Sequence, residues 1–325
     1  MSRIYEALQK AESERKSTQS DRESQNAAVP ESLERGWQST AVAEYEIPAA
    51  PPAETTRYTE FVPQGTTAPS SAAGLPTLDL DQVPKHPWTP IYSQLPALQE
   101  RGAAVEQFRS LRSRIHELRD ISPLKSILIT SGMPQEGKSF VATNLAISLA
   151  RHKNSKVLLI DGDMRRYTLH QLLGCQPHPG LADYLAGKAE MLEVMQRAEE
   201  MPTPGKPSSS ILPNLTFIAG GNGGDKAADL SGNPRFEELI RAASPYFDWI
   251  IVDSSPVIPV SDAVNLARAC DGVLLVARGG ITKFPVAQKA QNELRASNVL
   301  GFVLNAVEKQ PQVGTYYGYD GEKEE

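Results

Sequence analysis

Residues 132–139 read Gly-Met-Pro-Gln-Glu-Gly-Lys-Ser and fit the pattern G-x-x-x-x-G-K-[ST] without a mismatch. The apolar run SILIT (126–130) precedes them and FVATNLAISLA follows, which is the strand–loop–helix context that this pattern needs. In such a loop consecutive backbone N–H groups curl toward an anion, and the next helix presents its positive end to it. Lys138 would reach the β- and γ-phosphates, and Ser139 would offer its hydroxyl to Mg²⁺. The predicted ATP-binding residues are Gly132, Met133, Pro134, Gln135, Glu136, Gly137, Lys138, Ser139 and Phe140.

Two predicted strands end in carboxylates. The run KVLLID (156–161) continues so that Asp161 and Asp163 follow one strand tip, and WIIVDS (249–254) places Asp253 past another. Ligands of α/β folds bind beyond the carboxyl ends of the strands, and a carboxylate beside phosphates implies an intervening Mg²⁺. Taken alone, Asp-Gly-Asp is more often a turn than a site. Downstream of the phosphate loop we favour the site, with Asp253 holding the metal directly or through a water.

Three tyrosines, Tyr316, Tyr317 and Tyr319, lie among glycines and acids in the final segment GTYYGYDGEKEE. The tail alone is more typical of an unstructured terminus that happens to contain tyrosine. With an ATP site upstream, these side chains become candidate phosphate acceptors. A tyrosine hydroxyl has a pKa of about 10, so a carboxylate must take its proton as the bond to phosphorus forms.

The rest of the chain from about residue 103 supplies elements to position these groups. Apolar runs at 126–130, 156–161, 215–220, 249–254, 272–277 and 299–307 alternate with helical patterns at 103–119, 140–150, 234–244 and 285–297. Near-continuous apolar runs indicate strands that are covered on both faces. The pattern predicts an α/β fold with a doubly wound, mostly parallel sheet flanked by helices, as in P-loop NTPases. A segment rich in Pro and Ser (199–214) is expected to be a flexible surface insertion.

The first 95 or so residues are rich in Ser, Thr, Ala, Glu and Pro, a composition that cannot bury enough apolar surface to offset its ordering entropy. Ile4, Tyr5 and Leu8 repeat at helical spacing near the start. This short stripe predicts either a frayed helix or a docking peptide, and the two are about equally favoured. We predict three parts: a largely disordered tether (1–95), a P-loop domain (96–308) and a flexible, tyrosine-containing tail (309–325).

The bulk composition excludes some classes of protein. The formal net charge of −6 and the pI near 5.6 argue against a nucleic-acid binder, which normally shows a basic face. The sequence has no run of about 18 apolar residues to span a bilayer, and its charged N-terminus does not match a secretory signal. Cys175 and Cys270 lie far apart without ligand spacing, which favours inert thiols in a reducing compartment. The predicted location is the cytoplasm.

The P-loop followed by LLIDGDMRR and then IIVDSSP resembles the bacterial tyrosine kinases that accompany capsule and exopolysaccharide synthesis. That family has a second Walker-type motif, three apolar residues followed by D-x-D-x-R, which residues 158–165 match. The resemblance covers about residues 103–320 and implies an ATP-dependent tyrosine autokinase. It implies a catalytic set of Lys138, Asp161, Asp163 and Arg165, with Asp161 as the base, and metal ligands Ser139, Asp161, Asp163 and Asp253. By the same analogy Asn305 contacts adenine, although an ordinary strand-end asparagine is the more common case.

Two segments depart from the family pattern. The Walker B motif usually continues as D-x-P-P, whereas here Asp253 is followed by Ser254, Ser255 and Pro256. We therefore expect a less rigid loop after Asp253. The glycine-rich segment 219–230 lacks the proline-containing turn expected there. Neither departure removes a charged catalytic group, but both put full activity in doubt.

Glu106, Arg109 and Arg112 fit the E-x-x-R-x-x-R pattern that the resembling family uses to join subunits into a ring. From spacing alone, a solvated helix face is the more common explanation; the resemblance favours the interface. In this arrangement the tail of one subunit would enter the active site of its neighbour. Each phosphate would add a charge of about −1.5 to −2 and favour release.

The resemblance also implies a partner. Kinases of this family need a cytoplasmic segment of a membrane chain-length regulator, which we expect to be a separate chain reached through the N-terminal tether. Two other functions remain possible at this point: a regulatory ATPase of the partition or septum-placement type, and a non-catalytic nucleotide-sensing scaffold of a polysaccharide machine. The first type usually carries a lysine where this chain has Met133, and it lacks a tyrosine tail, so both features favour the kinase.

Overall fold

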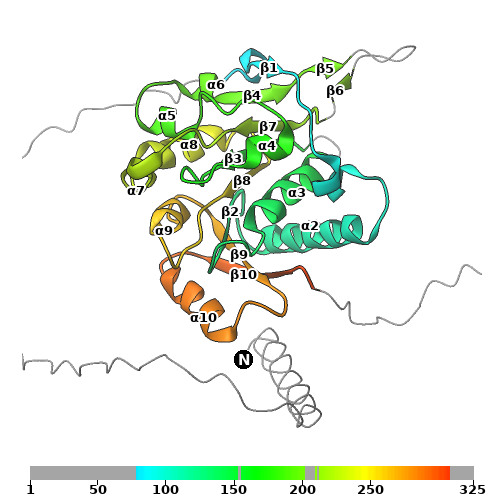
Figure 1. Cartoon of the computed structure of the whole chain (residues 1–325). Helices are drawn as coiled ribbons and strands as arrows, with labels where there is room; N and C mark the ends of the chain where they lie inside the picture. The colour runs from blue at the N-terminus through cyan, green and yellow to red at the C-terminus, as the bar shows by residue number, and fades with distance from the viewer. Residues whose placement is uncertain (1–77, 153–154, 202–208, 211, 308–325) are drawn as a thin grey trace, which may run out of the picture. The chain divides into compact units, whose positions relative to one another are not determined.

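The apolar runs of the sequence form the middle of an eight-stranded sheet (Figure 1). The structure is a computed structural model and describes residues 78–152, 155–201, 209–210 and 212–307. The strands lie in the order β1-β4-β7-β3-β8-β2-β9-β10, and their bounds are β1 (Lys85–His86), β2 (Ser126–Ser131), β3 (Val157–Asp161), β4 (Met195–Ala198), β7 (Leu215–Ile218), β8 (Trp249–Asp253), β9 (Gly272–Arg278) and β10 (Val299–Asn305). All neighbouring pairs are parallel except β4 with β7. The predicted, mostly parallel α/β sheet is confirmed.

Helices lie on both faces of the sheet (Figure 1), and this explains why the central strands are apolar at nearly every position. The helices are α2 (Ala103–Ile121), α3 (Lys138–Ala150), α4 (Leu169–Leu173), α5 (Leu181–Leu185), α6 (Met191–Val194), α7 (Ala227–Ser231), α8 (Arg235–Ala243), α9 (Asp262–Ala267) and α10 (Phe284–Glu293). Side chains of a strand alternate between faces, so Ile127 and Ile129 pack with α2, α3 and α4. Leu128 packs on the other side, with α5 to α10. The sheet is therefore doubly wound, as predicted.

The helix α2 packs as its periodicity predicted. Val105, Phe108 and Ile115 are buried, and Leu111 and Leu118 are partly buried against the same core. These side chains recur every three or four positions, which places them along one stripe of the helix. The opposite stripe is exposed and carries charged residues.

The folded part begins before the boundary that the sequence predicted. Trp88 and Leu95 are 5% and 0% exposed, and β1 extends the sheet by pairing with β4. Asn144 of α3 contacts both 3₁₀ segments, η2 (Tyr92–Gln94) and η3 (Pro96–Leu98): its Nδ2 donates to the Gln94 carbonyl at 3.3 Å, and its Oδ1 accepts the Ala97 N–H at 3.0 Å. Residues 78–95, which the sequence led us to assign to the tether, therefore pack with the domain in the described structure. The sequence did not indicate this packing because isolated apolar residues among prolines show no periodicity.

Some short elements had no clear sequence signal. The strand β4 has the sequence MQRA and pairs antiparallel to β7. In the expected insertion (199–214), β5 (Glu200–Met201) and β6 (Ser209–Ser210) form a two-stranded antiparallel sheet. The 3₁₀ segments η1 (Leu80–Gln82) and η4 (Gly224–Lys226) complete the described elements. None of the described helices is long and apolar enough to cross a bilayer.

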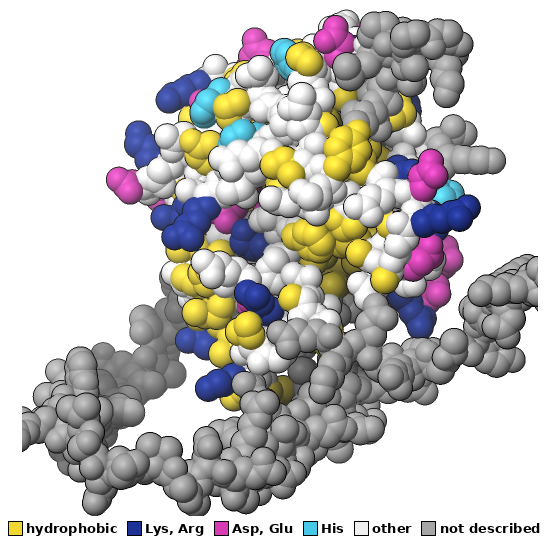
Figure 2. All heavy atoms as spheres, turned by 45° about the vertical axis from the view of Figure 1, so that its right-hand side comes forward, with side chains coloured by type: hydrophobic (Ala, Val, Ile, Leu, Met, Phe, Trp, Pro, Cys, Tyr) yellow, Lys and Arg dark blue, Asp and Glu magenta, His cyan; other side chains and the backbone are white. Residues whose placement is uncertain are grey.

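A few large apolar side chains are exposed, among them Tyr92 at 53% and Ile121 at 82%. Figure 2 brings forward the right-hand side of Figure 1 and shows hydrophobic side chains gathered toward the middle of this face. Most Asp and Glu side chains lie toward its edges, whereas some Lys and Arg side chains lie among the hydrophobic ones.

Candidate nucleotide-binding site

The loop between β2 and α3 has the backbone that an anion cradle requires. Gln135 and Gly137 have positive φ angles, 65° and 95°, and α3 begins at Lys138 directly after Gly137. A Cβ atom on Gly137 would lie 1.9 Å from Nδ2 of Asn305, so a side chain cannot be placed here without moving Asn305. Because Gly137 has no side chain, the last position of the loop leaves the N-terminal amide groups of α3 open to an anion.

Glu136 stabilises the conformation of this loop through its buried carboxylate. The sequence placed Glu136 among the predicted ATP-binding residues but indicated no such structural role for it. Its side chain is 4% exposed. Its Oε2 accepts the N–H of Met133 at 2.8 Å, while Oε1 accepts the hydroxyl of Thr282, in the loop between β9 and α10. The carboxylate thus joins two segments that are distant in sequence and holds the P-loop backbone in one shape. Only the i, i+3 spacing to Met133 could have suggested the first contact.

Asn305, the predicted adenine contact, lies at the end of β10 and donates from Nδ2 to the carbonyl oxygen of Glu136 at 3.0 Å. Its amide nitrogen therefore supports the P-loop in this structure. The side chain remains next to the cradle, where it borders the space beyond Gly137.

Lys138 and Asp163 form an ion pair inside the site. Their Nζ and Oδ2 atoms are 2.9 Å apart, and the side chains are only 13% and 5% exposed. Burial alone would lower the pKa of Lys138, but the charges of Asp253, Asp163 and Asp161 outweigh it and raise that pKa. The ammonium group is therefore held charged at the point where phosphate oxygens would lie.

Asp161 is completely buried at the tip of β3. Its Oδ1 accepts the N–H of Asp163 at 3.2 Å, and its Oδ2 accepts the N–H of Leu169 at 3.1 Å. Burial, followed by the charge of Asp253, raises its pKa well above the ordinary value. The carboxylate therefore organises the turn after β3 and also places a poorly solvated, proton-attracting group in the site.

Asp253 is the carboxylate with free oxygens. It is 1% exposed, and neither oxygen accepts a hydrogen bond of ordinary geometry from the described residues. Burial raises the pKa of Asp253, and Lys138, the Ser139 hydroxyl and the Ser254 N–H are the neighbours that oppose this shift. An orphaned, buried carboxylate beside a P-loop serine fits a hard cation such as Mg²⁺.

Gly162 brings the acidic strand tips together. Asp161 and Asp253 are paired across β3 and β8, and the Gly162 N–H donates to the Asp253 carbonyl at 2.9 Å. A Cβ on Gly162 would lie 2.6 Å from that oxygen.

In the described part of the chain, no three His, Cys, Asp or Glu side chains form a complete metal site. Phosphate oxygens and water would have to supply the other ligands, as is usual for Mg²⁺.

The segment after Asp253 is tied to β2 in spite of its missing proline. The Ser254 hydroxyl donates to the carbonyl of Ile129 at 3.0 Å, and the Thr130 hydroxyl donates to the carbonyl of Ser255 at 2.8 Å. Buried hydrogen bonds of this kind restrict the backbone. The loop after Asp253 therefore has specific contacts, contrary to the looser loop that the sequence led us to expect.

Arg165 lies next to this acidic group, but its guanidinium binds Asp262 at the start of α9. The Nε···Oδ2 distance is 2.7 Å, and a second bond of 3.2 Å joins NH2 to Oδ1. Asp262 is 1% exposed, whereas the Arg165 side chain is 34% exposed. The sequence predicted a catalytic role for Arg165. The structure shows that its guanidinium is oriented by Asp262, a partner that sequence reasoning missed.

The predicted interface residues lie together on α2. Arg109 binds the carboxylate of Glu106 one turn earlier, and Arg112 donates to the carbonyl of Ser148 at 2.8 Å.

The predicted phosphate acceptors Tyr316, Tyr317 and Tyr319 lie outside the described residues. The two cysteines are separate thiols, and burial raises the pKa of Cys175 to about 12, so this thiol stays protonated at neutral pH.

The family model for the CobQ/CobB/MinD/ParA nucleotide binding domain matches residues 127–316. The tyrosine-protein kinase YwqD of Bacillus subtilis (strain 168) is 34% identical over 221 residues, which are 67% of this chain and 87% of YwqD. The putative tyrosine-protein kinase EpsB of Ralstonia solanacearum is 34% identical over 219 residues, 66% of this chain. The match spans only 27% of EpsB.

Among solved structures, the kinase domain of the Escherichia coli tyrosine kinase ETK matches with a TM-score of 0.58 and 32% identity. The match covers 67% of this chain and 81% of that domain. All three of these relatives are named as tyrosine kinases, EpsB as a putative one.

Proposed function

The chain belongs to the bacterial tyrosine-protein kinase family, and we propose that it transfers the γ-phosphoryl group of ATP to tyrosines in its own C-terminal tail. One observation carries this proposal: charged Lys138, paired with Asp163, lies in the same acidic group as the unpaired carboxylate of Asp253. A cation and free carboxylate oxygens, both beside an open P-loop, are what a bound MgATP complex needs.

Each residue has a defined part in this reaction. The P-loop amide groups and Lys138 bind the phosphates, and Lys138 gives up part of its contact with Asp163 as it does so. Asp161 accepts the proton of the tyrosine hydroxyl, while Arg165, oriented by Asp262, faces the transferred group. Ser139 and Asp253 would hold Mg²⁺, which neutralises charge between the phosphates and the aspartates.

The acceptors are Tyr316, Tyr317 and Tyr319, phosphorylated in trans by a neighbouring subunit. Support comes from the sequence, which places them after the last strand among glycines and acids. Glu106, Arg109 and Arg112 lie together on α2, where they can contact another subunit. We propose that a homo-oligomer, a ring by analogy with the family, presents each tail to the next site.

By the same resemblance, we propose a role in exopolysaccharide or capsule synthesis and export. A separate membrane chain-length regulator would activate the kinase at the inner face of the plasma membrane, and the N-terminal residues would reach it. Pull-down from membranes with and without residues 1–95 tests this tether. Equal recovery of the two forms would remove the tether from the proposal.

Anti-phosphotyrosine blotting of the purified chain after incubation with MgATP tests the kinase itself. We expect signal in the wild type and none in Lys138→Met or in a truncation before Tyr316. Signal that survives Lys138→Met would point to a contaminating kinase. A wild type that binds MgATP but gives no signal, even with its membrane partner, would leave a nucleotide-sensing scaffold instead.

A further inference from the structure

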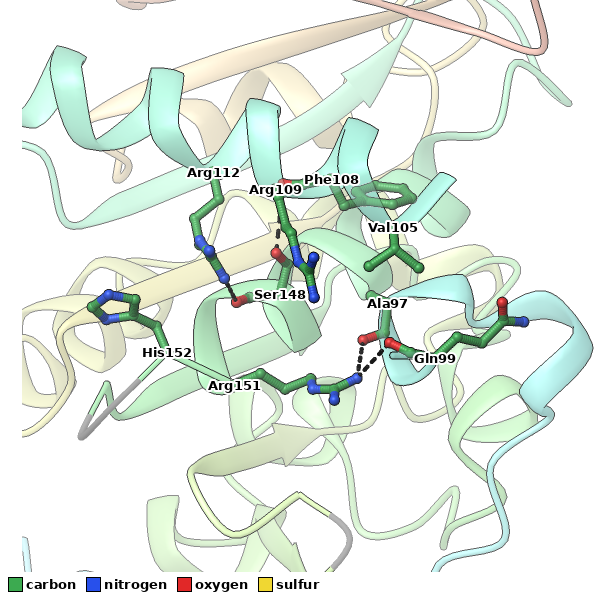
Figure 3. A pocket seen from close by; sticks show the side chains of 9 residues that line it. All are labelled: Ala97, Gln99, Val105, Phe108, Arg109, Arg112, Ser148, Arg151 and His152. Carbon is green, nitrogen blue, oxygen red and sulfur yellow. Dashed lines mark hydrogen bonds between the residues drawn. The ribbon is translucent and has the colours of Figure 1, made fainter. Parts of the chain in front are cut away.

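A pocket of about 390 Å³ lies at the far end of α3 from the P-loop (Figure 3). Its lining comes from α2, from η3 and the residue after it, and from the C-terminal end of α3: Ala97, Gln99, Val105, Phe108, Arg109, Arg112, Ser148, Arg151 and His152. The 13 residues of α3 separate it from Lys138 by about 20 Å, at a rise of ~1.5 Å per residue. The pocket is therefore distinct from the nucleotide site.

The residues that line this pocket carry positive charge and no negative charge. Three of its nine lining residues are arginines, a fourth is His152, and none is acidic. Burial and then the charge of Arg109 lower the pKa of Arg112, so the guanidinium groups oppose one another. Glu106, which pairs with Arg109, is 62% exposed and lies outside the lining. An anion that entered the pocket would relieve this repulsion.

The arginines are held in place and still have donors to offer. Arg112 uses NH1 to reach the carbonyl of Ser148, and Arg151 uses NH1 to reach the carbonyls of Ala97 and Gln99. Each guanidinium has five N–H donors, so most of them remain available in both side chains. Figure 3 shows Arg109 projecting from α2, and Arg151 extending from the end of α3 with its guanidinium turned toward Ala97 and Gln99.

One wall of the pocket is apolar. Val105, Phe108 and Ala97 lie beside the arginines (Figure 3) and are 4%, 7% and 4% exposed. Phe108 is fixed by a contact with the ring of Phe140, with centroids 5.7 Å apart. A planar ring could lie against this wall while an attached anion meets the arginines. A free carboxylate or inorganic phosphate would contact only the arginine side chains and not the apolar wall.

We propose that this pocket binds a phosphotyrosine side chain in the phosphorylated tail of this chain. The inference rests on the proposed function, which supplies phosphate on Tyr316, Tyr317 or Tyr319. The ring of the residue packs on Val105 and Phe108, and its phosphate binds Arg109, Arg112 and Arg151, with His152 at the edge. The tail is acidic, so its other side chains are complementary to the same surface. Arg109 and Arg112 also belong to the proposed subunit contact, so binding of the phosphorylated tail competes with that contact. The site recognises the product of the kinase, not its substrate.

Fluorescence anisotropy with a labelled peptide of residues 312–325, phosphorylated at Tyr317, tests this proposal directly. The protein is the dephosphorylated full chain with excess MgADP, which occupies the P-loop. We expect the phosphopeptide to bind at least about tenfold more tightly than its unphosphorylated form, since charge-assisted bonds are added. Phenyl phosphate should displace it at lower concentration than inorganic phosphate. Equal competition by the two would overturn the ring contact.

Two variants locate the binding. Arg109→Gln and Arg151→Gln should each weaken phosphopeptide binding about tenfold. Arg114→Gln is the matched control, because Arg114 lies on the same helix and makes the same i, i+3 pair, with Glu117, but does not line the pocket. Unchanged binding in Arg109→Gln, or equal losses in Arg114→Gln, would overturn the proposal even in a chain that is an active kinase. If circular dichroism shows that Arg151→Gln misfolds, the Arg109→Gln variant alone tests the proposal, because the Arg109 side chain is exposed.

Discussion

The ammonium group of Lys138 lies 2.9 Å from a carboxylate oxygen of Asp163, and both side chains are almost completely buried. Asp163 thus accepts a hydrogen bond from the ammonium group that ATP phosphates would also use. The same ammonium is attracted by Asp253 and Asp161. One cation therefore balances several carboxylates, and its removal affects the stability of the fold as well as its chemistry.

Lys138→Met should destabilise the nucleotide-free protein by about 3–5 kcal/mol, because it leaves the carboxylate of Asp163 buried without its partner. The double variant Lys138→Met/Asp163→Asn should recover part of this loss. Urea unfolding of the wild type, both single variants and the double variant measures the coupling. Additive effects would show that the two side chains do not interact in solution.

Asp253→Asn should stabilise the nucleotide-free protein while it removes MgATP binding. The folded-state pKa of Asp253 is raised, chiefly by burial, so ionisation costs stability as pH rises from the unfolded-state value of about 3.9 through the folded-state value. The advantage of Asp253→Asn should therefore be small at pH 4 and larger at pH 8.

Urea unfolding across that pH range measures the difference, and the exposed Asp229, changed to Asn, is the control. Nucleotide at about 100 times its Kd should add ~2.7 kcal/mol to the stability of the wild type, and little to Asp253→Asn. An Asp253→Asn protein that is less stable than the wild type at pH 8 would argue against a net cost of ionising this buried carboxylate.

Gly137→Ala should weaken ATP binding and reduce stability by more than backbone strain alone. Its φ is 95°, and a Cβ would displace Asn305 from its bond to Glu136. Gly280→Ala is the matched control, with φ 70° and no atom within 4 Å of an added Cβ, and should cost only about 1–2 kcal/mol. Adding Asn305→Ala should recover some stability in Gly137→Ala. Equal effects at the two glycines would rule out the contact with Asn305.

Glu136→Ala should raise the KM for ATP about tenfold, because it leaves the N–H of Met133 without a partner and releases the P-loop. Thr282→Val removes the other contact of the same carboxylate and should have a smaller effect in the same direction. Steady-state kinetics separates this from a change in kcat. A lower kcat at constant KM would instead place Glu136 in the transfer step.

Trp88→Ala should destabilise the fold by about 3–5 kcal/mol, since Trp88 is buried with its ring edge-on to Phe217, 6.3 Å between centroids. Tyr92, 53% exposed, provides the control, and Tyr92→Ala should change stability by less than about 0.5 kcal/mol. Thermal unfolding also checks the boundary: a chain that begins at residue 78 should match the full chain, and one that begins at residue 96 should not.

The central sheet and the P-loop were predictable because their signals are local. Runs such as VLLID and WIIVD are apolar at consecutive positions, and the structure makes them β3 and β8. The motif at 132–139 specifies its own backbone through Gly137 and through the helix that follows. The acidic residues at strand tips could be placed together because parallel strands end at one edge of a sheet.

By itself, the sequence determined the fold class, the phosphate loop and the three aspartates of the site, since periodicity and spacing encode them directly. Only the tertiary structure decided which partners those groups have: Thr282 for Glu136, Asp262 for Arg165, and backbone N–H groups for Asp161. Among the described residues it leaves the Asp253 carboxylate without a hydrogen-bond partner. It also decided that residues 78–98 join the domain. These contacts join segments far apart along the chain, and their strength depends on burial and distance, which no local pattern contains.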